Sequence, residues 1–174
     1  MKKQKKILIY GYGNPGRQDD GLGIFFSEAI EKWVYENKFD HISCDSNYQL
    51  NIEDAELISN YDLVLFADAS QEDLEDYSIT SVECSTSRIE FSMHAVSPAF
   101  VLDLCNKIYN KSPETYLLHL KGYEWDFKEG LSPEAQNNFN KAFLEVKEAI
   151  EQQSDFKAIV HSKSDDRELK LINE

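Results

Sequence analysis

Hydrophobic positions along the chain form two kinds of pattern, short continuous runs and longer stretches with helical spacing. The runs at residues 7–10 and 62–68 have continuous apolar interiors, as expected of strands buried on both faces of a sheet. Weaker runs at residues 41–44, 79–84 and 116–120 predict further strands. The pattern therefore predicts a sheet of about five strands.

Apolar residues spaced three and four apart predict helices between these strands. Such stretches cover residues 22–34 and 52–59. Ser97-Pro98 and Ser132-Pro133 are typical helix starts, because serine caps the first turn and proline fits the first helical position. Strands that alternate with helices favour a parallel sheet. We therefore expect an α/β fold, a three-layer sandwich with a mostly parallel, twisted sheet and helices on both faces.

The periodic pattern ends near Gln152, which divides the chain into two parts. Residues 1–152 are expected to form one α/β domain, and residues 153–174 a polar C-terminal tail. Within that tail, residues 156–160 are apolar enough to dock as a small strand. Residues 89–93 are a further short candidate strand.

Composition and charge narrow the possible partners. The 174 residues are 41% hydrophobic and 12% aromatic, which indicates a folded chain with a sizeable core. Eighteen basic against 32 acidic residues give a net charge of -14. Such a surface repels phosphate backbones, so we expect neither nucleic acid nor an anionic membrane as a partner.

Cysteine spacing and the start of the chain bear on localisation. Cys44, Cys84 and Cys105 are widely spaced and form no zinc-finger pattern, which fits a reducing compartment. The basic segment at residues 1–6 imitates the start of a signal peptide, but the apolar run behind it is too short. We therefore expect a cytoplasmic protein.

A glycine-rich segment follows the first predicted strand. Gly11, Gly13 and Gly16 satisfy the GxGxxG pattern of dinucleotide-binding turns. Asp19 and Asp20, however, would repel a pyrophosphate, and the helix is expected to begin only near Gly21. A dinucleotide-binding module remains the alternative interpretation of this segment.

The two adjacent carboxylates have different expected roles. Asp19 is explained as a helix cap. Asp20 is expected to point into a crevice, as is Asp68 at the end of the strand at residues 62–68, because ligands of open α/β sheets bind at the carboxyl ends of strands.

Of the four histidines, His94 is the one expected to share this crevice, because it lies directly before a capped helix. Asp20, Asp68 and His94 together suit a borderline divalent metal such as nickel or zinc. If the protein is a hydrolase, a metal ion would supply an activated water or polarise a carbonyl group.

Four segments, in order, resemble signatures of the nickel–iron hydrogenase maturation proteases. They are residues 11–23, Ala67-Asp68-Ala69, Ser92-Met93-His94 with Ser97-Pro98, and residues 122–133. The resemblance spans roughly residues 7–150. It implies an endopeptidase that removes the C-terminal extension of a hydrogenase large-subunit precursor after nickel insertion.

The resemblance also assigns roles to individual residues. The metal-binding residues of the family fall on Asp20, Asp68 and His94, and the nickel they recognise is carried in by the precursor. It leaves the attacking group unassigned. An alternative within the same resemblance is a protein that binds the nickel site without cutting.

Two loops differ from the pattern of the family. Residues 45–50 lack the paired glycines common after the second strand, and residues 70–74 lack the usual glycine and proline. Both differences bear on which hydrogenase is processed. Residues 13–16 are also similar to the opening of peptidyl-tRNA hydrolases, but the net charge disfavours an RNA substrate.

Overall fold

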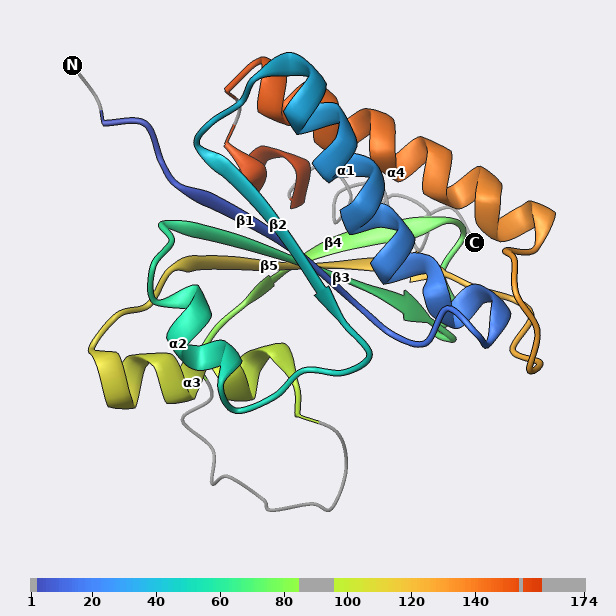
Figure 1. The fold of residues 1–174 in the computed structure, drawn as a ribbon, viewed down its shortest axis with the longest axis horizontal. Helices are drawn as coiled ribbons and strands as arrows, with labels where there is room; N and C mark the ends of the chain where they lie inside the picture. The colour runs from blue at the N-terminus through green and yellow to red at the C-terminus, as the bar shows by residue number, and fades with distance from the viewer. Residues whose placement is uncertain (1–2, 85–95, 154, 161–174) are drawn as a thin grey trace, which may run out of the picture.

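The computed structural model describes residues 3–84, 96–153 and 155–160, and Figure 1 shows its ribbon. Five strands alternate with helices along most of the chain. The elements are β1 (Ile7–Tyr12), the 3-10 helix η1 (Gln18–Gly21), α1 (Leu22–Asn37), β2 (Ile42–Asn47), α2 (Asp54–Ile58), β3 (Leu63–Ser70), β4 (Tyr77–Val82), α3 (Pro98–Tyr109), β5 (Glu114–Lys121) and α4 (Pro133–Glu151).

The five strands form one sheet in the order β2-β1-β3-β5-β4. β2, β1, β3 and β5 are parallel, and β4 pairs antiparallel with β5 at one edge. The sequence-based prediction of a mostly parallel sheet of about five strands is therefore confirmed.

Helices cover both faces of this sheet, as Figure 1 shows. On one face α1 and α4 pack over a core that includes Ile9, Phe26, Leu65 and Val146. On the other face α2 and α3 enclose a smaller core. The three-layer α/β sandwich predicted from the sequence is confirmed.

Both predicted serine caps are present. The Oγ atom of Ser97 accepts a hydrogen bond from the backbone N–H of Phe100 (3.2 Å), and Ser132 Oγ accepts one from Ala135 (3.2 Å). Proline follows each serine as the first residue of its helix. These local signals therefore set where α3 and α4 begin.

The structure differs from the prediction in several boundaries. β3 continues to Ser70 because its pairing with β5 extends that far, and β4 begins at Tyr77. Residues 156–160 are helical, so the expected small strand is wrong. They nevertheless pack on the core, where the buried Phe156 ring stacks on Tyr116 at 5.8 Å between centroids.

The candidate strand at residues 89–93 lies outside the described residues, and the domain division near residue 152 stays a prediction. Among the helices that the structure describes, none combines the length and the apolar character needed to cross a membrane.

Candidate functional site

The strand order has a switch point at β1, where the chain changes direction across the sheet. β1 is followed by β2 on one side, and the chain then crosses to place β3 on the other side of β1. In open α/β sheets ligands bind beyond the carboxyl ends of the strands at such a switch point. Asp20 follows β1 and Asp68 lies near the end of β3, so both expected residues occur at this point.

Glycines allow the start of α1 to approach the sheet very closely. A Cβ atom on Gly11 would lie 1.9 Å from the carbonyl oxygen of Gly23, and one on Gly23 would lie 2.3 Å from that of Ala67. Gly13 has a φ of 138°, and its Cβ would lie 2.1 Å from the carbonyl oxygen of Asp20. These contacts leave no room for side chains, so the glycines serve to hold Asp20 beside the strand ends.

The backbone donors of the glycine loop are already engaged within the protein. The N–H of Gly13 donates to the carbonyl of Asn47 (3.2 Å), and the N–H of Asn14 donates to Oδ2 of Asp20 (3.0 Å). The N–H of Gly16 donates to the side chain of Asn14 (2.9 Å). A dinucleotide turn needs these groups for the pyrophosphate. The arrangement therefore disfavours the dinucleotide interpretation.

Asp20 and Asp68 interact electrostatically and are both partly buried. Burial raises the pKa of Asp68 to about 7, and repulsion from Asp20 acts in the same direction. Hydrogen bonds from the Tyr12 hydroxyl and from the backbone of Ala69 partly oppose this shift. Two like charges in one crevice are costly, and a bound cation would relieve that cost.

Tyr12 is a site residue that the sequence reasoning missed. Its hydroxyl hydrogen-bonds to Asp68, and burial together with that carboxylate raises the pKa of the phenol above its usual value. Gly11 pairs with Ala67 in the sheet, so the next residues along the two strands are Tyr12 and Asp68. Only the register between β1 and β3 reveals this neighbour, and the sequence does not supply the register.

Two histidines bear on this end of the sheet. His94 lies outside the described residues. His119 pairs in register with Asp68, so the structure adds a second histidine near the strand ends, where the sequence pointed to His94. The Nε2 atom of His119 is 2.9 Å from the hydroxyl of Thr80. Within the described parts of the chain, no three His, Cys, Asp or Glu side chains are grouped to hold a metal ion.

Asp19 does not cap a helix, contrary to expectation. Its side chain is fully buried and accepts hydrogen bonds from the backbone N–H groups of Tyr123 (2.8 Å), Glu124 (3.0 Å) and Ser132 (2.7 Å). The hydroxyl of Ser132 donates a fourth bond (2.7 Å). Burial alone would raise the pKa of Asp19, but these donors outweigh it and lower the pKa. The position of Asp19 in the sequence suggested that it caps the adjacent helix. Its hydrogen-bond partners instead lie more than a hundred residues further along the chain.

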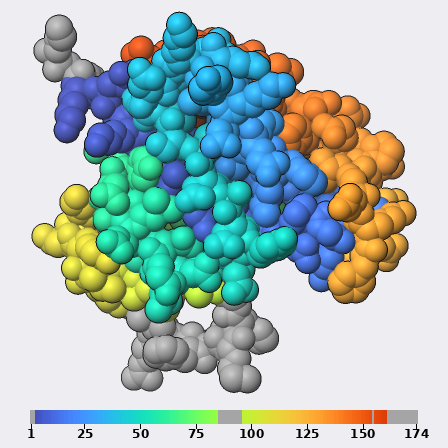
Figure 2. All heavy atoms as spheres, in the orientation of Figure 1, coloured from blue at the N-terminus to red at the C-terminus, as the bar shows by residue number. Residues whose placement is uncertain are grey.

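Gln18 binds the same distant loop as Asp19. Its side-chain amide donates to the carboxylate of Glu124 (2.9 Å) and accepts from the backbone of Asp126 (3.0 Å). A Cβ on Gly122 would lie 2.9 Å from that of Asp19, so the two segments touch directly. Figure 2 shows the orange loop against the blue segment that follows β1. We call residues 122–132 the clamped loop.

The clamped loop presents exposed aromatic side chains next to η1. Tyr123 is 42% exposed and Phe127 is 86% exposed. The guanidinium of Arg17 lies 4.9 Å from the centre of the Phe127 ring. The loop therefore offers an apolar surface next to η1, on a backbone that Asp19 holds in place.

Comparison with known proteins rests on structure. No protein-family model matches the sequence, and no curated protein matches it. The [NiFe] hydrogenase maturation protease HycI from Thermococcus kodakarensis superposes with a TM-score of 0.68 at 19% identity, covering 86% of this chain and 95% of that one. The hydrogenase maturating endopeptidase HybD from E. coli gives 0.65 at 20% identity, covering 85% and 93%.

A third similar structure comes from an archaeon. The hydrogenase 2 maturation peptidase of a Thaumarchaeota archaeon gives a TM-score of 0.60 at 19% identity, covering 84% of this chain and 98% of that one. The three similarities extend over nearly the whole of each relative. The chain therefore has the fold of the [NiFe] hydrogenase maturation proteases.

Proposed function

We propose that this protein is an endopeptidase that removes the C-terminal extension of a nickel–iron hydrogenase large-subunit precursor. Its cleavage follows nickel insertion, and Asp20, Asp68 and His94 recognise the nickel that the precursor carries. Nickel is then part of the substrate, and zinc or another divalent ion is able to substitute for it. The alternative of a dinucleotide-binding module is disfavoured because the glycine loop donates its N–H groups internally.

One observation carries the proposal. Asp20 and Asp68 interact electrostatically at the switch point of a sheet whose fold matches maturation proteases. The repulsion between them is relieved when a cation binds, which makes the crevice selective for a metal-loaded partner. Carboxylate and imidazole groups are suitable ligands for such an ion.

The chain's own residues prepare this recognition. The Asn14 N–H fixes one oxygen of Asp20 (3.0 Å) and leaves the other oxygen as a ligand. The Tyr12 hydroxyl orients Asp68. Because both partners are held by β1 and the turn after it, the carboxylates are positioned before the precursor arrives.

The test is processing of nickel-loaded precursor, followed by the mass of the large subunit. Asp20→Asn and Asp68→Asn keep the side-chain shape and remove the charge, and we expect each to slow cleavage by at least about 100-fold. His94→Ala is expected to have a similar effect. Asp40→Asn is the matched control, because Asp40 is exposed and lies before β2, at the opposite end of the strands.

Two outcomes would contradict the proposal. Wild-type rates in the Asp20 and Asp68 variants would exclude the site, and cleavage of nickel-free precursor at the full rate would exclude nickel recognition. Nickel-dependent binding of precursor with no shortened product would instead indicate a non-catalytic binding protein.

A further inference from the structure

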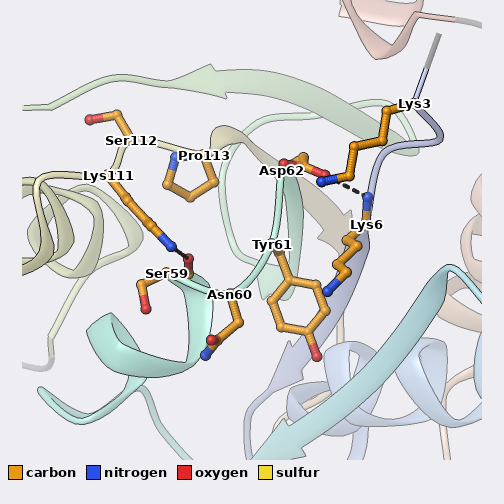
Figure 3. Close-up of a pocket in the computed structure, with 9 residues that line it drawn as sticks. All are labelled: Lys3, Lys6, Ser59, Asn60, Tyr61, Asp62, Lys111, Ser112 and Pro113. Carbon is orange, nitrogen blue, oxygen red and sulfur yellow. Dashed lines mark hydrogen bonds between the residues drawn. The ribbon is translucent and has the colours of Figure 1, made fainter.

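A pocket lies at the amino ends of β1, β3 and β5, on the opposite edge of the sheet from Asp20. Its volume is about 470 Å³, and three separate segments line it, residues 3–6, 59–62 and 111–113. Figure 3 shows Lys111 on one side of this pocket and Lys3 and Lys6 on the other. We call it the lysine pocket.

Backbone hydrogen bonds fix the three segments to one another. The carbonyl of Lys6 accepts from the N–H groups of Asp62 (2.9 Å) and Leu63 (3.1 Å). The carbonyl of Asp62 accepts from the N–H of Glu114 (3.0 Å), which directly follows the third segment. The backbone of the walls is therefore part of the sheet framework, and the exposed lysine side chains extend from it.

The charge in the lysine pocket is opposite to that of the whole chain. Three ammonium groups and one carboxylate line it, although the chain carries a net charge of -14. The Oδ2 atom of that carboxylate, Asp62, accepts the backbone N–H of Lys6 (2.8 Å). Within the described ranges, the ion pairs join Lys5 to Glu114, Lys107 to Asp103 and Lys141 to Asp76, and none involves a lysine of the pocket.

Hydrogen bonds hold several polar side chains of the pocket in place. The ammonium of Lys111 donates to the carbonyl of Ser59 (3.1 Å), which positions it while two further hydrogens remain for other acceptors. The Ser59 hydroxyl and the Asn60 amide also line the pocket, but they donate to the backbone carbonyls of Glu56 and Leu57. The three lysine ammonium groups are therefore the main donors that the pocket offers to a ligand rich in acceptor oxygens.

We infer that the lysine pocket binds a small molecule that bears phosphate groups. Its volume lies in the range of small-molecule sites, while its polar lining suits a charged ligand. Lysine is a common phosphate-binding residue, acting as a point charge. The lysines face the pocket from opposite sides, so they surround a compact polyanion better than they follow an extended acidic peptide.

The probe for this site is pyrophosphate, titrated into the isotopically labelled protein at constant ionic strength. We expect saturable shifts of the backbone amide signals of Asn60, Lys111 and Ser112. The double variant Lys6→Gln/Lys111→Gln is expected to weaken binding at least tenfold. The control Lys32→Gln/Lys157→Gln removes two exposed lysines elsewhere and is expected to bind like the wild type.

Several results would overturn this inference. They are shifts that rise linearly without saturating, equal weakening in both double variants, or tighter binding of a short poly-glutamate peptide than of pyrophosphate. A second pair, Lys3→Gln/Lys6→Gln, retains the bond between Lys111 and Ser59 and must also weaken binding. The measurement is independent of hydrogenase processing, so it separates this site from the proposed function.

Discussion

Asp19 and Asp20 are neighbours in η1, yet they belong to two regions with opposite surroundings. Asp19 is enclosed by hydrogen-bond donors from the clamped loop and from Ser132. Asp20 is partly exposed and interacts electrostatically with a second carboxylate, Asp68. The negative charge of Asp19 is fully compensated by hydrogen-bond donors. The charges of Asp20 and Asp68 are not neutralised by a cation within the described residues.

The difference separates a structural from a recognition role. A buried carboxylate with four donors stabilises the ionised form and the segments that supply the donors. A carboxylate beside another carboxylate destabilises the ionised pair and gains most when a cation binds. Identical side chains at consecutive positions are therefore distinguished by their partners and not by the motif that contains them.

The largest expected effect on stability comes from Asp19. Asp19→Ala leaves the N–H groups of Tyr123, Glu124 and Ser132 without their acceptor, so we expect a loss of about 3 kcal/mol in the free energy of unfolding. Asp20→Ala is expected to cost less than about 1 kcal/mol, because water reaches its partner. Urea unfolding measures the free energy of unfolding of both variants. Equal losses would contradict the distinction between a structural Asp19 and a recognition residue Asp20.

A smaller effect is expected at Gly122. A Cβ there would lie 2.8 Å from the Trp125 ring and 2.9 Å from the Cβ of Asp19, so Gly122→Ala should cost about 2 kcal/mol by overpacking. Gly16→Ala is the control, since among the described residues its Cβ would closely approach only the Asn14 side chain, at 3.2 Å. Thermal unfolding measures the difference in stability between the two variants. A Gly122→Ala variant as stable as the wild type would show that the clamped loop can shift to accommodate the added methyl group.

The smallest effect is in the pH dependence of stability. An unfolded Asp titrates near pH 4. The pKa of Asp19 is lowered on folding, so its stabilisation is present above about pH 4 and is lost as the pH falls. The pKa of Asp68 is raised to about 7, so the folded state loses stability as the pH rises from about 4 to 7.

These opposite shifts predict opposite behaviour of two asparagine variants in metal-free buffer. Relative to the wild type, Asp68→Asn should gain about 1 kcal/mol in stability between about pH 5 and pH 8, after allowance for partial exposure. Asp19→Asn should approach the wild type as the pH falls below about 4. Parallel pH profiles of the two variants would contradict the assignment of the two environments.

Local sequence signals predicted most of the fold. The apolar runs gave the central strands, and Ser97-Pro98 and Ser132-Pro133 gave the starts of α3 and α4. The strand-end rule placed Asp20 and Asp68 at one edge. Each of these signals acts within a few residues or follows from the general topology of parallel sheets, which is why the sequence was sufficient.

Contacts between distant segments could not be predicted in this way. Tyr12 meets Asp68 because of the register of two strands, and Asp19 meets Ser132 because α4 begins where the clamped loop returns. The charge of the lysine pocket depends on three segments that the sheet brings together. Hydrophobic period and motif spacing carry no information about such pairings.

The bonds of Asp19 also constrain the order in which the molecule is completed. Its partners Tyr123 and Ser132 follow it by 104 and 113 residues. A ribosome synthesises η1 long before these donors exist, so the Asp19 carboxylate must remain hydrated until the last third of the chain emerges. Bringing Asp19 together with Tyr123 and Ser132 closes a long stretch of chain, so we expect it to be a late and slow folding step. In a chain that stops short of α4, the turn that carries Asp20 would lack the hydrogen bonds that Asp19 makes to Ser132.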